Sequence, residues 1–592
     1  MSSSSNPTLK LHLTPNVDDS GTVKSLSARL TIGGLRRGLQ GGSPYNSEEP
    51  IFLFTNDTDG NSGDVIAKRG IRIEDDNGPV NTSAKSCDGS LAVYADRDIQ
   101  GDASIQFNTY PQDTNDRKDG GLRRENGGLV GIGTFLPRPY TKGTYDITIT
   151  NETTSTAKIV TSLGEGATGT ETTLQECIFM IGNVHSYPAE RTSGSGSCAT
   201  HWLSDLPRPL DAVKDFSNNM FSHLSKFFKD EHGSYRAFLA KAPNVSGRLI
   251  GQTSTSVVHV IRNQPFNPAG PKAMAKAYNK FNVPMPSALA STISQVGNDN
   301  SCLGASLIEY DEDTASDSDW SLVRVFNKSM IKAWAQLDPE DDGTPNDWFS
   351  EGLSNLYTIY LPFRFKQRSP DYFRATLNAN LTAYFTNPLI DTPLSELPPA
   401  STTWHVEALR QSRFCIYMIR MDCFTRRASV ARDAGVERPI DEIVADISVR
   451  RRKGDKVQEK DWLKYIGDWV GHEEAKRHLD EMKSGKVLDL EDMKTAFGGI
   501  DAVEGKMMQM GFDRVSLTNG LVSGVIDGSN ASMAGLKDGD EIMWHSRVGE
   551  CEADCGNKFT VKVRRDGEER EIEYLPREDK VVKMWRSIKK ET

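Results

Sequence analysis

The first 182 residues alternate short hydrophobic and polar runs in the way that β-strands do. Such runs occupy residues 10–13, 51–54, 91–94, 145–150 and 177–181. Turn-forming sequences such as Asn77-Gly78 separate them, and the intervening stretches are rich in Thr, Ser, Gly, Asn and Asp. Two-residue alternation broken by such turns is typical of antiparallel sheets. The pattern therefore predicts an N-terminal β-sandwich-like domain over residues 1–182.

Hydrophobic residues take on helical spacing from about residue 200. One face of segment 211–229 collects six apolar side chains: Val213, Phe216, Met220, Phe221, Leu224 and Phe228. Because residues three and four apart share a helix face, we expect this segment to be helical. Further segments with this spacing lie at residues 321–337, 347–360, 410–429, 439–452 and 459–483. We predict a mainly helical domain over residues 183–500, ending with a linker helix over residues 487–497.

The C-terminal part returns to short strands, predicted at residues 521–525, 559–563 and 569–574. The run GSNASMAGLKDGDEI occupies residues 528–542, where Gly535 is placed to end a short helix and Gly539 to form the following turn. This run resembles a PDZ domain, which implies a PDZ-like domain over residues 501–592. Such a domain captures a peptide as an added strand. The alternative is a module that only braces the rest of the chain.

Composition and charge exclude several classes of protein. The chain has 592 residues, of which 37% are hydrophobic and 26% charged, as in ordinary globular proteins. Its formal net charge of −11 argues against a nucleic-acid partner, which would favour a basic surface. The sequence shows no signal-peptide pattern and no apolar run near the ~18 residues that span a membrane. We therefore expect a cytoplasmic protein with no nucleic-acid and no membrane partner.

One stretch carries recognisable chemistry. The sequence Asn-Lys-Ser-Met-Ile-Lys-Ala-Trp at residues 327–334 precedes an acidic loop, and Asp-Trp-Phe-Ser-Glu-Gly follows at residues 347–352. Trp-Phe-x-Glu-Gly after such a helix resembles the glycyl aminopeptidase family of PDZ-bearing zinc metallopeptidases, which are gluzincins. The resemblance extends over about residues 1–590 and is loosest in the first 180. It implies an α+β multidomain chain: a β domain, a thermolysin-like, mainly helical peptidase domain and a PDZ domain.

In that family the first helix carries His-Glu-x-x-His, and its two histidines bind zinc together with the Glu of the second motif. Here Lys328, Ser329 and Lys332 stand at the positions of the first His, the general-base Glu and the second His, and only Glu351 remains. An ammonium group has no lone pair to give to a metal. The ten histidines include no two that lie four residues apart. We therefore expect no metal and no cofactor, and no zinc-peptidase activity.

The substituted residues suggest a chemistry of their own. Lys328 and Lys332 are one helical turn apart, so both ammonium groups can face Glu351 across a cleft. Burial and a like-charged neighbour lower the pKa of a lysine, which can then act as a base or form a Schiff base with a carbonyl. Lys328, Lys332 and Glu351 are thus the candidate catalytic residues. The alternative is that the two lysines only stabilise an inert cleft.

The resemblance also supplies three candidate substrate-binding residues. Trp348 belongs to the second motif, and Gln411 stands at about the position of the family's oxyanion-binding Tyr. His259 lies on a strand-like run that the family places along the substrate cleft. For His259 a role as a buried structural histidine is the competing interpretation.

Three functions remain open. The first is a metal-free, repurposed enzyme of lyase or cyclase type that acts on a small carbonyl-containing metabolite by proton abstraction, aldol-type or cyclisation chemistry, as in secondary-metabolite biosynthesis. The second is a non-catalytic pseudopeptidase that binds peptides or a partner protein through its cleft and its PDZ domain. The third is an active zinc aminopeptidase, which the missing ligands disfavour. The partner is accordingly a small-molecule substrate, a peptide or a protein held by the PDZ domain.

Overall fold

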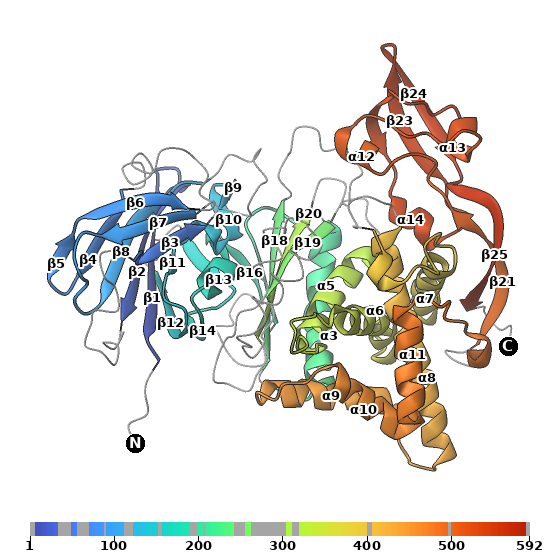
Figure 1. The fold of residues 1–592 in the computed structure, drawn as a ribbon. Coiled ribbons are helices and arrows are strands. Elements are labelled where there is room, and N and C mark those ends of the chain that lie inside the picture. Colours follow the sequence, from blue (N-terminus) through green and yellow to red (C-terminus); the bar gives the residue numbers. More distant parts are fainter. Residues whose placement is uncertain are drawn as a thin grey trace. The chain divides into compact units, whose positions relative to one another are not determined.

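The computed structural model of the chain is shown in Figure 1. The residues that it describes are 6–33, 49–55, 70–87, 90–111, 122–151, 157–188, 198–206, 208–231, 233–241, 255–261, 303–310, 319–398, 405–494 and 499–587. The chain divides into two compact units. Unit 1 comprises Met1–Lys214, Asp230–Val245 and Val257–Tyr310, and unit 2 comprises Asp215–Lys229, Ser246–Ser256 and Asp311–Thr592.

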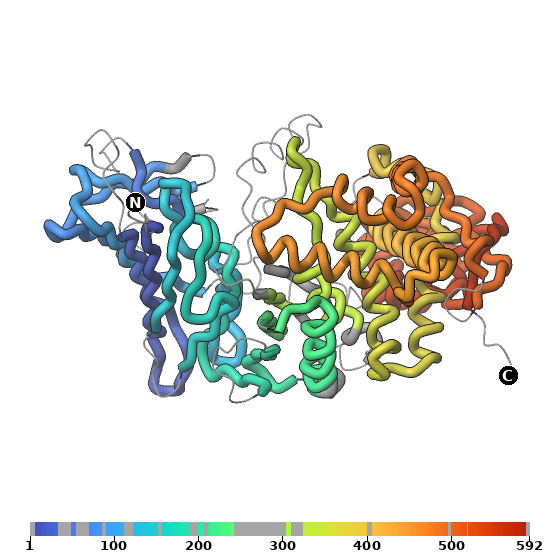
Figure 2. The backbone as a smooth tube through the Cα atoms, turned by 90° about the horizontal axis from the view of Figure 1, so that it is seen from below, coloured from blue at the N-terminus to red at the C-terminus, as the bar shows by residue number. Residues whose placement is uncertain are grey.

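A seven-stranded sheet forms the largest part of unit 1, with the strand order β14-β12-β1-β2-β8-β4-β5. The strands are β1 (Thr8–Val17), β2 (Val23–Gly33), β4 (Arg72–Asp75), β5 (Gly78–Val80), β8 (Ala103–Thr109), β12 (Thr144–Asn151) and β14 (Gly166–Thr170). Strand β1 pairs antiparallel with β2 and parallel with the much later β12, so these segments lie side by side (Figure 2). Leu9, Leu11 and Leu13 alternate into the core as predicted from their spacing.

Two smaller sheets share the same hydrophobic core. Their orders are β13-β15-β10-β9 and β11-β3-β7-β6. The strands are β3 (Phe52–Thr55), β6 (Thr82–Cys87), β7 (Ser90–Ala95), β9 (Arg123–Glu125), β10 (Gly128–Ile132), β11 (Arg138–Pro139), β13 (Lys158–Thr161) and β15 (Ile178–Gly182), with the short helices η1 (Gly133–Phe135) and α2 (Thr173–Glu176). The first 182 residues are therefore β-rich.

A separate five-stranded sheet closes unit 1, with the order β16-β17-β18-β20-β19. Its strands are β16 (His185–Tyr187), β17 (Cys198–Trp202), β18 (Ser234–Lys241), β19 (Thr255–Ile261) and β20 (Leu303–Tyr310). Strands β17, β18 and β20 run parallel to one another, whereas β16 is antiparallel to β17. The segment that we predicted to be mainly helical thus also contains a sheet.

Helices dominate unit 2. They are α5 (Asp319–Trp334), α6 (Asp347–Arg364), α7 (Pro370–Phe385), α8 (Val406–Ala431), α9 (Pro439–Arg452), α10 (Glu459–Val470) and α11 (His472–Lys483); the earlier α3 spans Arg208–Phe227, and η3 is Leu394–Glu396. Helix α8 contacts α6, α7, α9, α10 and α11. A helix surrounded in this way buries residues on every side, and residues 412–419 of α8 are all buried.

The C-terminal module of unit 2 has a hydrophobic core of its own. Strand β21 (Ile500–Met508) pairs antiparallel with β25 (Arg577–Ser587), and β22 (Glu541–His545), β23 (Phe559–Arg565) and β24 (Glu568–Tyr574) form a second sheet. The module also contains α12 (Val515–Asn519), α13 (Asn530–Met533) and α14 (Val548–Ala553). Arg577 links it to the residue that follows α7, since its Nη1 donates to Oγ1 of Thr386 at 3.1 Å. Its Nη2 donates to the carbonyl oxygen of Cys551 within the module.

Several sequence-based elements differ from the structure. The linker helix predicted over residues 487–497 is wrong, since its only helical part among the described residues is the 3₁₀ turn η4 (Glu491–Met493). The backbone before this turn runs along α7, where the N–H of Leu488 donates to the hydroxyl of Tyr384. Residues 521–525 are not a strand, and only Leu521 forms an isolated bridge, with Glu541. The segment 459–483 is two helices, because Gly471 has a φ of +99°.

The architecture is a mixed α+β multidomain one, with several sheets and a helical core. The predicted domain boundaries, 1–182, 183–500 and 501–592, stay predictions. In the part of the chain that the structure describes, no helix combines the length and apolarity that crossing a bilayer requires.

Candidate functional site: two lysines on one glutamate

Two lysines of α5 share one glutamate of α6. Nζ of Lys328 lies 3.0 Å from Oε2 of Glu351, and Nζ of Lys332 donates a hydrogen bond to Oε1 of the same carboxylate. The contact of Lys328 is an ion pair without hydrogen-bond geometry, since Oε2 has no hydrogen-bond partner among the described residues. The structure therefore brings together all three residues that the sequence offered as catalytic.

The sequence around these residues explains their position. Phe326 and Met330 are buried, and helical spacing turns Lys328 and Lys332 away from that apolar side of α5. Helix α6 approaches α8 closely at Gly352, where an added Cβ would lie 2.8 Å from the carbonyl oxygen of Phe414. Glycine at this position lets α6 pack tightly, and the preceding residue on α6 is the glutamate of the cluster.

The cluster is largely withdrawn from water. The side chains of Lys328, Lys332 and Glu351 are 17%, 13% and 23% exposed. Burial by itself raises the pKa of Glu351, but the charges of Lys328 and Lys332 outweigh it and lower the pKa from 4.5 to about 2. Glu351 is therefore a carboxylate at neutral pH. Two ammonium groups and one carboxylate leave a single positive charge in the cluster.

The positive face of α5 continues with Arg324, one turn before Lys328. Burial lowers the pKa of Arg324, and the nearby Glu552 acts against it. Among the described residues, no hydrogen bond or ion pair holds this guanidinium. Glu552 belongs to α14 of the C-terminal module, where burial raises its pKa to about 7 against the charges of Arg514, Arg577 and Arg324. Glu552 of the C-terminal module thus interacts electrostatically with Arg324 of α5.

Two of the candidate substrate-binding residues lie within unit 2. Trp348 is only 6% exposed; its Nε1 donates to Oδ1 of Asn346 at 3.2 Å, and its ring packs edge-to-face against Tyr417. Gln411 is partly exposed: its Nε2 donates to Oε1 of Glu407 at 2.6 Å. Its carbonyl oxygen accepts from Asn355, one turn after Glu351 on α6, at 3.2 Å. Gln411 therefore lies one helical turn from the cluster, whereas Trp348 belongs to an aromatic core.

The third candidate, His259, lies in β19 of unit 1, and its side chain falls outside the described residues. Substrate-binding roles for His259, Gln411 and Trp348 stay predictions.

The residues at this site do not fit a zinc ion. A zinc site of this kind needs three side chains with a lone pair, and here two of the three positions carry ammonium groups bound to the remaining carboxylate. Within the described ranges, no three His, Cys, Asp or Glu residues come together as a metal site. At this carboxylate the two lysines supply positive charge and no lone pair for a metal.

Sequence reasoning missed the contribution of the C-terminal module. Glu552 and Arg577 follow the cluster by about two hundred residues or more, and no motif or spacing connects them to α5. Arg324 was recognisable on the polar face of α5, but its interaction with Glu552 was not. The relevant signal is tertiary, since it depends on the packing of α14 against α7.

Comparisons with known proteins bear on the fold alone. No protein-family model and no curated protein matches the chain. A solved aminopeptidase N family protein from Idiomarina loihiensis is similar over 96% of each chain, with a TM-score of 0.57 and 11% identity. An M1 zinc metallopeptidase from Deinococcus radiodurans covers 82% of this chain and 95% of its own, with a TM-score of 0.43 and 14% identity. From the first of these likenesses, the chain has the fold of an aminopeptidase N-like protein.

Proposed function

We propose that this chain is a metal-free enzyme built on a peptidase-derived scaffold, and that it acts on a small carbonyl-containing molecule at the Lys328–Glu351–Lys332 cluster. The observation that carries the proposal is the shared carboxylate: two ammonium groups bind one glutamate and leave one positive charge in a mostly buried place. A preorganised positive charge in such a place stabilises an oxygen on which negative charge develops. The reaction class is therefore enolisation, aldol-type addition or cyclisation.

The three residues have different roles, which follow from their charges. Glu351 is ionised and fixes both lysines, and a carboxylate with a pKa of about 2 is a weak base. The lysine ammonium groups donate hydrogen bonds to the substrate carbonyl and stabilise the enolate or alkoxide oxygen, while solvent water takes the proton that leaves the carbon next to the carbonyl. This role differs from the Schiff-base chemistry considered above, which needs a neutral amine. Arg324, with no hydrogen bond or ion pair among the described residues, is placed to bind an acidic group of the same substrate.

Deuterium exchange tests the proposal without a known product. The protein is incubated in D₂O with a panel of 2-oxo and 3-oxo acids, and NMR follows exchange at the carbon next to the carbonyl. We expect exchange with at least one acid, and a loss of about 10²-fold or more in Lys328→Met and in Lys332→Met, as for removal of an oxyanion donor.

Lys464→Met is the matched control, because Lys464 is an exposed lysine of α10. Circular dichroism establishes that each variant is folded. No exchange with any acid, or full exchange in both cluster variants, contradicts the enzymatic proposal. So does a zinc content near one atom per chain.

A pseudopeptidase is the second candidate, and a feature of the C-terminal module favours it. Leu521, Ile526 and Met533 are 52%, 49% and 70% exposed. Exposed apolar side chains in a PDZ-like module suit the capture of a hydrophobic peptide terminus. Fluorescence anisotropy with a library of C-terminal peptides tests this function. Binding that Met533→Asp removes supports it, and absence of binding to every peptide counts against it.

A further inference from the structure

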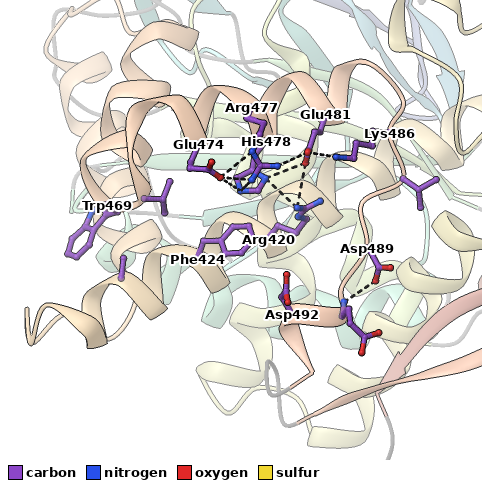
Figure 3. A pocket seen from close by; sticks show the side chains of 14 residues that line it. Arg420, Phe424, Trp469, Glu474, Arg477, His478, Glu481, Lys486, Asp489 and Asp492 are labelled. Carbon is purple, nitrogen blue, oxygen red and sulfur yellow. Dashed lines mark hydrogen bonds and ion pairs between the residues drawn. The ribbon is translucent and has the colours of Figure 1, made fainter.

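A pocket lies in the helical part of unit 2. It has a volume of about 550 Å³ and is formed by α8, α10, α11 and the segment that follows α11 (Figure 3). No residue of the Lys328–Glu351–Lys332 cluster lines it. Its volume falls in the range of pockets that bind small molecules.

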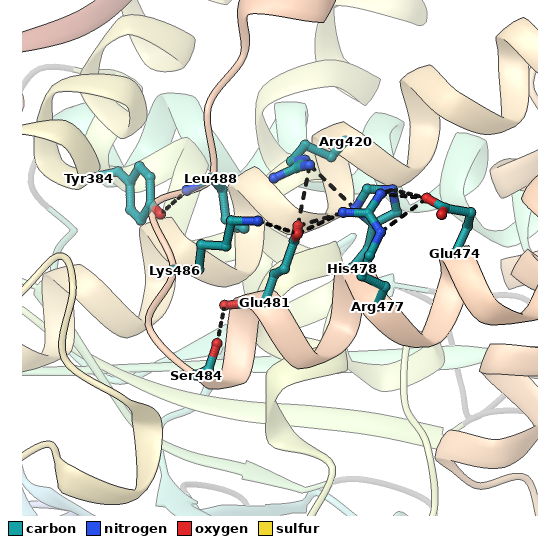
Figure 4. Close-up of polar contacts among 9 residues, drawn as sticks. All are labelled: Tyr384, Arg420, Glu474, Arg477, His478, Glu481, Ser484, Lys486 and Leu488. Atoms are coloured by element: carbon teal, nitrogen blue, oxygen red, sulfur yellow. Dashed lines mark hydrogen bonds and ion pairs between the residues drawn. The ribbon is translucent and has the colours of Figure 1, made fainter.

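One side of the pocket is a closed network of charges (Figure 4). Glu481 accepts hydrogen bonds from Arg477 and Lys486, each at 2.6 Å, and lies 3.6 Å from Nη2 of Arg420. Nδ1 of His478 lies 3.3 Å from Nη2 of Arg420. These contacts hold the side chains of α11 in place and satisfy most of the charges on this wall.

This network does not use all the hydrogen-bond donors of Arg420. Its side chain is only 12% exposed, and Nη2 is its one nitrogen with a hydrogen-bond or ion-pair partner among the described residues. Nε is buried without any hydrogen-bond partner. A guanidinium offers five N–H donors in a planar fork that matches a carboxylate. The donors of Nη1, which has no partner among the described residues, therefore remain for a ligand that carries an anionic group.

An acidic group faces Arg420 from the opposite rim. Asp492 is exposed, and in Figure 3 its carboxylate points into the pocket towards Arg420 and Phe424. Asp489 and Glu491 line the same rim, but Lys583 lies 3.5 Å from the first and 3.0 Å from the second. Asp492 forms no ion pair with any described residue. The rim thus offers one carboxylate for a positively charged group.

The wall beside these two charges is apolar. Phe424 stacks one face on the ring of His478, with centroids 4.7 Å apart, and is partly exposed. Ala428, Trp469 and Val470 continue this wall. Such a wall favours an apolar side chain, because burying it removes hydrocarbon surface from water.

We propose that this pocket binds a free α-amino acid with an apolar side chain. Its carboxylate accepts hydrogen bonds from Arg420, its ammonium group pairs with Asp492, and its side chain packs on Phe424. The two charges of an α-amino acid are close together, with the side chain on the carbon between them, and this matches a guanidinium and a carboxylate that face each other beside an apolar wall. The proposal is independent of the chemistry at Lys328 and Lys332.

Ligand-observed NMR titration with L-phenylalanine tests this inference on the full chain. We expect saturable binding, and binding at least about fivefold weaker for N-acetyl-L-phenylalanine, for L-phenylalanine amide and for L-serine, which lack the ammonium group, the carboxylate and the apolar side chain. The dipeptide Phe-Gly, whose charges are farther apart, separates a free amino acid from a peptide terminus. Binding of the dipeptide at least as tight as that of L-phenylalanine overturns the assignment to free amino acids.

Two substitutions that each remove one negative charge test where the ligand binds. We expect Asp492→Asn to weaken the binding of L-phenylalanine about fivefold or more. Asp501→Asn, at an exposed aspartate of β21, leaves it unchanged. Both positions are on the surface, so the fold is retained. No saturable binding, or equal affinity in Asp492→Asn and the natural chain, overturns the proposal.

Discussion

Nζ of Lys328 lies 3.0 Å from Oε2 of Glu351, whose other oxygen accepts a hydrogen bond from Lys332. The carboxylate is therefore the common partner of both lysines, and its loss affects the site differently from the loss of one ammonium group. Removing one lysine leaves a balanced ion pair. Removing the glutamate leaves two positive charges facing each other in a mostly buried place.

The first prediction concerns Glu351→Gln and pH. At pH 7 we expect this variant to lose about 2 kcal/mol of folding stability, because breaking a buried ion pair leaves an unbalanced charge. The pKa of Glu351 is lowered from 4.5 to about 2, so its contribution is present above pH 4.5 and disappears as the pH falls towards 2. Urea unfolding at pH 7 and pH 3 measures the change. Glu442→Gln, at an exposed glutamate of α9, is the control.

If the free energies of unfolding of Glu351→Gln and the natural chain differ by the same amount at pH 7 and pH 3, that result would falsify this electrostatic account.

The second prediction concerns a variant in which the metal ligands are restored. The triple variant Lys328→His, Ser329→Glu, Lys332→His recreates His-Glu-x-x-His on α5 while Glu351 stays in place on α6. Three such side chains are the usual ligand set for zinc in this geometry. We expect elemental analysis to find about one zinc per chain in the triple variant and none in the natural chain.

Adding Glu351→Gln to the triple variant removes the third ligand, and we expect the zinc content to fall sharply. A triple variant that is folded but takes up no zinc would show that α5 and α6 no longer hold the geometry of a metal site.

The third prediction uses Glu552, whose pKa burial raises from 4.5 to about 7. For a raised carboxyl pKa, the stabilising contribution is complete below pH 4.5 and is lost as the pH rises through 7. We therefore expect the melting temperature of Glu552→Gln, relative to that of the natural chain, to rise as the pH increases from 5 to 8. Glu550→Gln, on the exposed side of the same helix, provides the comparison. A melting-temperature difference that is the same at pH 5 and pH 8 for Glu552→Gln refutes the prediction.

The fourth prediction concerns the attachment of the C-terminal module. Arg577 is 2% exposed and donates to Thr386 of unit 2's helical part and to the carbonyl oxygens of Cys551 and Asp554. In Arg577→Met these buried acceptors lose their donor, which costs about 2–3 kcal/mol. Thermal unfolding measures the loss, with Arg586→Met on the exposed side of the same strand as control. Equal stability of the two variants would show that Arg577 does not fasten the module.

The local pattern of the sequence predicted local structure well. The spacing of Phe326, Met330 and Trp334 placed the apolar side of α5, and the two lysines are on its other side. The prediction failed where a contact with a residue far away in the sequence determines the backbone conformation. Leu488 is held by the hydroxyl of Tyr384, about one hundred residues earlier, so its segment is not helical. The charged groups that interact with Glu552 could not be predicted either, because they come together only through packing between elements.

The shared carboxylate also bears on how this chain could change over generations. A chain in which only Lys328 has become histidine still carries the ammonium group of Lys332, which repels a zinc ion and already binds Glu351. The same holds if only Lys332 changes. Each single substitution weakens the existing cluster without creating a competent metal site, so selection for either state opposes the intermediate. Conversion of this cluster into a metal site therefore requires both lysines to change, and no single substitution achieves it.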